Sequence, residues 1–195
     1  SCLTSKQEKH MSDAQEYTLF SGGAAGTETL FGELAQKHGL QEVNFSFAGH
    51  KPSRTENLRP LTADELARKD VSLTYVSKLL DRKFTNAPYL RDVLRTIMYQ
   101  VDSSLEVFVV GTIQEDGTVK GGTGWGAEFA KICNKPLFVF GQVKNGWFTW
   151  DHAQSIWAPV DAPTITQKQY CGTGTRFLEE NGKKAVEDLF ARSFA

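Results

Sequence analysis

Apolar positions follow two kinds of spacing along this chain, and the shortest apolar runs predict strands. A run at 17–20 and an alternating pattern at 43–48 each have the length and period of a strand. Continuous apolar runs at 106–111 and 136–140 are typical of strands buried on both faces of a parallel sheet. A short final strand is predicted at 170–171.

Longer segments carry apolar residues at helical spacing. A helix is expected from Thr62 as N-cap, with Glu65 at the capping-box position. Another begins at Pro88 and has apolar positions up to Val101. The predicted helices cover 28–38, 62 to about 81, 88 to about 101, 128–133 and 178–190.

The alternation of these strands and helices predicts the fold class. We expect an α/β protein with a doubly wound, mostly parallel sheet and helices on both faces, a Rossmann-like three-layer sandwich. Residues 16–195 form a single domain and 1–15 a flexible tail, in which Met11 is either the natural start or an internal residue. Ligands of such sheets bind at the carboxyl ends of the strands.

Composition narrows the class of protein. Hydrophobic residues make up 40% of the chain and charged residues 23%, as in ordinary globular proteins. The net charge of −1 disfavours nucleic-acid binding through bulk charge, and no apolar stretch reaches the ~20 residues that span a bilayer. Cys2, Cys133 and Cys171 are scattered, which indicates reduced thiols in a cytoplasmic protein; Cys171 is either a small core residue or a reactive thiol.

Glycine clusters after predicted strands are the main candidate ligand sites. A strand that turns through glycines into a helix leaves backbone N–H groups and the positive end of the helix dipole facing a ligand, which favours phosphate. None has the Lys-Ser/Thr pair of a P-loop or the dinucleotide fingerprint. The candidate binding residues are Ser21, Gly22, Gly23, Gly26 and Thr27 in the first cluster, Gly121, Gly122, Thr123, Gly124 and Trp125 in the second, and Gly174, Thr175 and Arg176 in the third.

Charged residues near these clusters suggest chemistry. Glu128 follows Gly121 by seven positions and either meets a ribose or faces solvent as a helix residue. The same two alternatives hold for Glu28, where a first-turn dipole partner is favoured. Arg91 and Arg95, one turn apart, either bind phosphate or form a solvated helix face.

Aromatic and neighbouring polar residues leave further alternatives open. Tyr99 has the position to stack on a base, and Arg176 either reaches a phosphate or pairs with Glu179 or Glu180. His152 beside Asp151 is a weak catalytic pair. Trp147, Phe148, Trp150 and Trp157 either wall a base-binding pocket or cover the edge of the sheet.

The glycine clusters resemble a known superfamily. Residues 121–128 resemble the Gly-Gly-x-Gly-Thr-x-x-Glu motif of the LOG (Lonely guy) phosphoribohydrolases, and 21–28 are similar to the first turn of DprA-like and YpsA-like proteins. These belong to the SLOG superfamily of Rossmann-like nucleotide-binding domains. A closer resemblance is to an uncharacterised phage and bacterial branch, through Tyr99-Gln100-Val101, Gly121 to Trp125, Lys135-Pro136, Trp147 and Gly172 to Arg176.

The resemblance implies that both glycine loops bind phosphate, with Glu128 as the catalytic carboxylate and Arg95 as the helix arginine of an N-glycosidic hydrolase. Trp125 stands where the enzymes have threonine, and a polar stretch at 112–120 separates the strand from the glycines. A nucleotide sensor or molybdenum-cofactor carrier is therefore the alternative, and DprA-like binding of single-stranded DNA a third. No cofactor is certain; the expected ligand is a nucleotide or an ADP-ribose-like compound, and a homodimer is expected.

Overall fold

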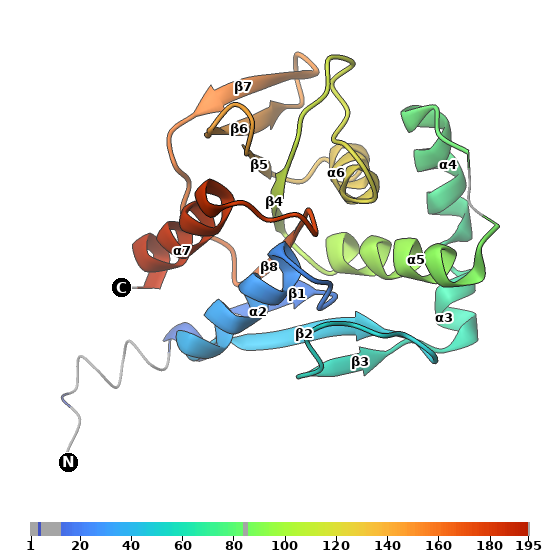
Figure 1. Cartoon of the computed structure of the whole chain (residues 1–195), viewed down its shortest axis with the longest axis horizontal. Coiled ribbons are helices and arrows are strands. Elements are labelled where there is room, and N and C mark those ends of the chain that lie inside the picture. The colour runs from blue at the N-terminus through green and yellow to red at the C-terminus, as the bar shows by residue number, and fades with distance from the viewer. Residues whose placement is uncertain (1–3, 5–12, 84–85, 195) are drawn as a thin grey trace.

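The computed structural model describes residues 4, 13–83 and 86–194, whose strands form one eight-stranded sheet (Figure 1). The strand order is β3-β2-β1-β8-β4-β5-β6-β7, and neighbouring strands are parallel except at one edge, where β6 pairs antiparallel with both β5 and β7. The strands are β1 (Thr18–Ser21), β2 (Gln41–Ser46), β3 (Leu58–Pro60), β4 (Glu106–Gly111), β5 (Leu137–Gly141), β6 (Gly146–Asp151), β7 (Ile156–Val160) and β8 (Gln169–Gly174). The predicted fold class is confirmed.

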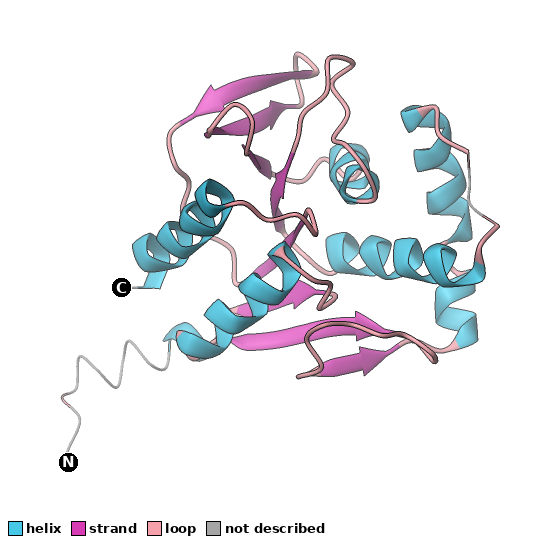
Figure 2. Cartoon of the chain, in the orientation of Figure 1, coloured by secondary structure: helices cyan, strands magenta, loops and turns pink. Residues whose placement is uncertain are grey.

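Helices cover both faces of the sheet, so the molecule has three layers (Figure 2). The helices are α2 (Thr27–Lys37), α3 (Ala63–Ala67), α4 (Asp70–Leu80), α5 (Pro88–Asp102), α6 (Thr123–Ile132) and α7 (Glu180–Phe194). The side chains of β4 alternate between two cores: Phe108 and Val110 pack with α2 and α7, whereas Val107 and Val109 pack with α4, α5 and α6. Both faces of the central strand β4 are therefore buried in apolar packing, as its continuous apolar run predicts.

The last strand of the chain lies in the middle of the sheet. Rossmann folds commonly have the order 3-2-1-4-5-6, and here β8 is inserted between β1 and β4. The chain leaves β1 through α2 toward one edge and leaves β4 through α6 toward the other. The connections diverge around β8, which makes the carboxyl ends of these three strands the topological switch point where open α/β sheets bind ligands.

Two predicted helices have different limits in the structure. The capping box of Thr62 and Glu65 is confirmed, but the helix expected over 62–81 is two helices, α3 and α4. The hydroxyl of Tyr99, on α5, donates to the carbonyl oxygen of Glu65 at 2.6 Å. In a continuous helix that oxygen would accept from a backbone N–H one turn later. Helix α6 starts at Thr123 rather than at residue 128, because the glycine cluster forms its first turn.

Three further differences come from tertiary packing. Strand β8 extends through Gly172, where a side chain would collide with the ring of Phe31 on α2. The tryptophan-rich segment, for which no strand was expected, forms β6 and β7. Helix α7 ends later than predicted because Phe194 packs edge-on against Tyr17, with ring centroids 5.1 Å apart.

Most of the predicted N-terminal tail, including Cys2 and Met11, lies outside the described residues. Ala14, which the prediction placed in that tail, packs into the core beside α2 and α7. Within the described part of the chain, no helix combines the length and the apolar character needed to cross a membrane.

Candidate functional site

A cavity of about 260 Å³, here called the inner cavity, opens at the switch point. It lies where β1, β8 and β4 end, and all three glycine clusters contribute to its wall, as their positions after strands predict. The contributing residues from these clusters are Gly22, Ala24, Gly121, Gly122, Thr123, Gly174, Thr175 and Arg176. Ser21, Gly23, Gly26, Thr27 and Gly124 do not line it, and Trp125 lines only an adjoining hollow.

The first glycine loop is packed against its neighbours. Gly23 and Gly26 have φ values of +72° and +83°, which side-chain-bearing residues rarely adopt. A Cβ at Gly26 would lie 2.7 Å from the carbonyl oxygens of Thr175 and Arg176. The backbone N–H and hydroxyl of Thr27 both donate to the Thr175 carbonyl, at 3.2 and 2.9 Å. Glycine is therefore required here for close packing.

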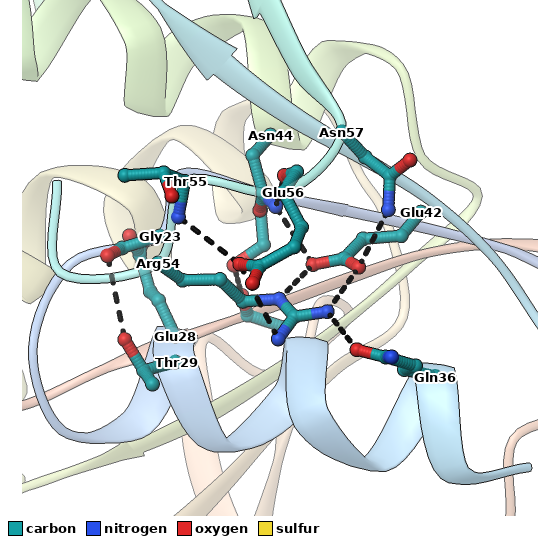
Figure 3. Close-up of polar contacts among 12 residues, drawn as sticks. Gly23, Glu28, Thr29, Gln36, Glu42, Asn44, Arg54, Thr55, Glu56 and Asn57 are labelled. Atoms are coloured by element: carbon teal, nitrogen blue, oxygen red, sulfur yellow. Dashed lines mark hydrogen bonds and ion pairs between the residues drawn. The ribbon is translucent and has the colours of Figure 1, made fainter.

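A buried ion pair fastens the loop at 49–57 to β2 and α2, beside the first glycine loop (Figure 3). The guanidinium of Arg54 donates to both carboxylate oxygens of Glu42, at 2.6 and 2.8 Å, and to the amide oxygen of Gln36 at 3.0 Å. The hydrogen bond from Arg54 to Glu42 raises the pKa of the arginine. Because the backbone N–H of Arg54 also donates to the Gly23 carbonyl at 3.0 Å, the pair fixes the loop that carries His50 to the rim of the cavity.

Glu28 lies buried in the wall of the inner cavity, in the first turn of α2. Its carboxylate accepts from the Ala24 N–H at 3.1 Å and from the Thr173 hydroxyl at 2.7 Å, and the side chain of Gln100 is a third partner. Burial raises the pKa of Glu28, and these three hydrogen bonds oppose the rise. The residue that the sequence presents as a helix-dipole partner is thus a cavity carboxyl with a perturbed pKa.

Gln100, which also lines the inner cavity, has an acceptor without a described partner. The side chain is 1% exposed, and its Nε2 lies so close to Gly22 that a Cβ there would be 2.5 Å from it. Within the described structure its Oε1 is buried without a hydrogen-bond partner. A buried acceptor with no donor costs free energy, on the order of 1–3 kcal/mol, unless a ligand or water satisfies it.

The second glycine cluster is open where the first is packed. No described atom lies within 4 Å of a Cβ built at Gly121 or Gly122, which directly precede α6. The glycines inside the helix are crowded, Gly124 against the carbonyl of Val119 and Gly126 against the side chain of Ile97. The N–H groups of Gly124 and Trp125 donate to the carbonyl oxygens of Gly121 and Gly122, at 3.0 and 3.1 Å, and no described side chain caps the helix. This end of α6 therefore offers the cavity mainly the positive potential of the helix dipole. The exposed side chains of Lys120 and Arg176 line the same space.

The polar stretch that separates β4 from this cluster folds as a small hairpin. Ile113 bridges to Val119, and the Gln114 N–H donates to the Thr118 carbonyl at 2.8 Å. Arg82 donates to the carbonyl oxygens of Val119 and Gly121, at 2.9 and 2.7 Å. These contacts hold the open end of α6 in place at the cavity.

The two residues expected to be catalytic do not line the inner cavity. Glu128 forms an ion pair with Lys131 at 3.1 Å, and the Lys131 ammonium lies 3.8 Å from the ring centroid of Trp150. Arg95 binds Asp70 through two nitrogens, at 2.8 and 2.9 Å, and Asp92 through a third. The structure gives both side chains intramolecular partners on α4, α5 and α6, and their predicted roles are without geometric support.

Other candidates also have structural partners. The Lys69 ammonium lies over the ring of Tyr99, 4.6 Å from its centroid, and the Arg91 guanidinium lies 3.8 Å from the Asp70 carboxylate. The Ser21 hydroxyl donates to the Gly172 carbonyl at 2.6 Å, and a ring nitrogen of His152 contacts the Lys135 carbonyl. The predicted residues that do meet in the cavity come from the second and third clusters and from Gly22.

The remaining cysteines and aromatic residues behave as packing groups. Burial raises the pKa of the Cys171 thiol well above its ordinary value, which disfavours the reactive thiolate. Trp150 and Trp157 pack edge to face in β6 and β7, with centroids 5.1 Å apart, and neither lines the inner cavity. Among the described residues no cluster of His, Cys, Asp or Glu has the arrangement of a metal site.

The fold and cavity define a class: a Rossmann-like α/β protein with a cavity at the switch point of its sheet. Comparisons of the chain with protein-family models, curated proteins and solved structures give no match. The resemblance to the SLOG superfamily therefore stays a prediction from the glycine clusters.

Sequence reasoning understated Glu28 and Gln100. Glu28 stands directly after the first glycine cluster, so its position was visible, but its burial was not. Gln100 is a polar residue among the apolar positions of α5, at 97, 98 and 101, and this break in the pattern was the available signal.

Proposed function

We propose that the protein binds a nucleotide or a nucleotide-derived phosphate ligand in the inner cavity. The observation that carries the proposal is that one cavity is lined both by the uncapped N-terminus of α6 and by Gln100, whose amide oxygen is buried without a described partner. The end of α6 and Arg176 favour an anion, whereas the free Oε1 of Gln100 calls for a hydrogen-bond donor. A phosphorylated sugar carries both kinds of group.

The position of Glu28 favours different roles for the two glycine clusters. Its carboxylate already takes the Ala24 N–H of the first loop, and a phosphate placed there would meet a second anion. We therefore assign the phosphate to the second cluster, at Gly121 and Gly122, and sugar or base hydroxyl and amino groups to Glu28 and Gln100. The expectation of two phosphate cradles is replaced by one cradle and one polar wall.

Calorimetric titration with nucleoside mono- and diphosphates, NAD and ADP-ribose tests the binding proposal. Arg176→Ala should weaken binding of every phosphate ligand, since it removes an exposed cation from the cavity. Arg68→Ala, an exposed arginine that lines neither the inner cavity nor the hollow beside it, is the matched control and should leave binding unchanged. A wild-type protein that binds none of these compounds would refute the proposal.

Glu28 favours a second, catalytic function: hydrolysis of an N-glycosidic bond. In this reaction the bond from the anomeric carbon to the base nitrogen breaks, and the base leaves with the electron pair. Water adds its hydroxyl to the carbon, and its remaining proton goes to the base. A buried carboxylate beside the sugar would stabilise the positive charge that develops there.

Liquid chromatography of nucleotide incubations separates the catalytic function from binding alone. Release of free base that Glu28→Gln abolishes and Glu128→Gln leaves intact would support hydrolysis with Glu28 in the role first expected of Glu128. Ligand recovered unaltered from a protein that binds it would favour the sensor or carrier instead.

A further inference from the structure

A second hollow of about 600 Å³, here called the outer cavity, adjoins the inner one. Its walls come from the basic loop after β2, the start of α5 and the open end of α6. The two cavities share six lining residues. These are Ala24, His50, Val93, Ile97, Gly122 and Arg176.

Two of the groups that favour an anion lie between the two cavities. Gly122, at the N-terminus of α6, and the exposed Arg176 line both spaces. A phosphate bound there would have room on each side. In contrast, an anion site for a simple phosphate monoester needs space on one side only.

The outer cavity differs from the inner one in chemistry. Tyr89 and Leu90, 43% and 56% exposed, present apolar surface to it beside the buried Trp125. The wall is held in place, because the Tyr89 hydroxyl accepts from the Lys51 N–H at 3.2 Å and its ring meets that of Phe47 edge-on. Such a wall suits a flat or apolar group, whereas Glu28 and Gln100 make the inner wall polar.

The volumes of the two cavities also favour a ligand that occupies both. Cavities that bind small molecules typically measure roughly 300–1,000 Å³. The inner cavity, at about 260 Å³, falls below this range, and the outer one, at about 600 Å³, falls within it. A ligand confined to the inner cavity would leave the larger hollow filled with water over exposed apolar side chains.

We propose that the ligand is a phosphodiester or a pyrophosphate diester, with its phosphate between the cavities, a polar sugar in the inner one and a flat or apolar group in the outer one. This inference rests on the proposed function and narrows its ligand to dinucleotide-like compounds. Simple mononucleotides fill only one of the two spaces.

The test compares ADP, ADP-ribose and NAD by calorimetry, because all three share adenosine and both phosphates and differ in what the far phosphate carries. NAD, whose far phosphate carries the flat nicotinamide, should bind at least about tenfold more tightly than ADP, the change that roughly 1.4 kcal/mol of binding free energy gives. ADP-ribose, whose far phosphate carries a sugar without that ring, should gain less. Leu90→Asp, in the exposed wall of the outer cavity, should remove this advantage and leave ADP binding within about twofold, under roughly 0.5 kcal/mol.

Controls separate the possible failures. Leu105→Asp changes a leucine of similar exposure, 52%, outside both cavities and should leave the preference intact. Tyr89→Ser repeats the test should Leu90→Asp fail to fold. Equal affinities for ADP and NAD, or an equal loss for all ligands in Leu90→Asp, would overturn the inference and leave the proposed function standing. Absence of binding by every compound would instead refute the proposed function.

Discussion

The first and second glycine clusters look alike in sequence and differ in the folded protein. Each precedes a helix and each contributes to the inner cavity. The first is enclosed. A Cβ at Gly23 would lie 2.6 Å from the carbonyl oxygen of Arg54, and one at Gly26 would lie 2.7 Å from those of Thr175 and Arg176. At the second, Gly121 and Gly122 face open space.

The difference lies in what each loop does with its backbone donors. The first loop gives the Ala24 N–H to its own carboxylate, Glu28, and is fastened through Arg54. In the second loop the N–H groups of Gly124 and Trp125 turn back onto the carbonyl oxygens of Gly121 and Gly122, and no described side chain caps the start of α6. The contacts that anchor this loop, from Arg82, are to carbonyl oxygens only. A glycine cluster before a helix thus indicates either tight packing or an anion site, and only the neighbours decide which.

Removal of the Arg54 anchor should have the largest effect. Arg54→Met leaves the carboxylate of Glu42, 2% exposed, buried without its counter-ion, so the free energy of unfolding should fall by about 3–5 kcal/mol in urea denaturation. Glu56→Gln is the control, because Glu56 is 55% exposed and 3.6 Å from Arg54; its cost should stay below about 1 kcal/mol. Similar costs for the two variants would mean that the first loop is not fastened in this way.

A methyl group added to the first loop should have the next largest effect. Gly26→Ala combines an unfavourable φ of +83° with a Cβ 2.7 Å from two backbone carbonyl oxygens. Strain and overpacking together should cost roughly 2–4 kcal/mol in the same denaturation experiment. A cost below about 0.5 kcal/mol, the range of ordinary surface changes, would show that this loop is as open as the second.

The fold could be predicted from sequence further than the site could. Apolar runs such as 106–111 gave the buried strands, and the order of elements gave the parallel sheet, because burial on one or two faces determines periodicity. The hairpin of β6 and β7 was missed since its aromatic residues fit a packed loop as well as a strand.

For the site, the edge of the sheet was predictable and the carboxyl was not. Glu28 and Glu128 both stand near a glycine cluster, and the resemblance favoured Glu128. Whether Glu28 or Glu128 lines the cavity depends first on where α6 starts relative to Gly121. It depends also on Thr173 and Gln100, which contact Glu28 from distant parts of the chain. Contacts of this range leave no mark in local sequence.

Glu28→Gln tests whether burial raises the pKa of the carboxyl beside the first loop. Burial raises the pKa of Glu28 above its ordinary 4.5, so the folded state binds its proton more tightly than the unfolded state. The stability contributed by the protonated carboxyl is therefore fully present below the ordinary pKa of 4.5 and is lost as pH rises through the higher pKa of the folded state. Relative to Glu28→Gln, the wild type should lose up to about 1.4 kcal/mol per pH unit across this window.

Urea denaturation of both proteins at several pH values measures this difference. Thr173→Val removes a hydrogen bond that opposes the rise in the pKa of Glu28, so it should extend the loss of stability to higher pH. A wild-type stability that runs parallel to that of Glu28→Gln at all pH values would contradict the perturbed carboxyl.

The smallest change in stability is expected at the second cluster. Gly122 has φ −59° and ψ −31°, ordinary helical values, and no described atom lies within 4 Å of a Cβ added to it. Gly122→Ala should therefore alter the free energy of unfolding by less than about 0.5 kcal/mol. Since that methyl group would stand between the inner and outer cavities, any loss of nucleotide affinity in this stable variant reports on the anion site itself. A large loss of stability would instead show that the second cluster is packed like the first, and the contrast between the two loops would fail.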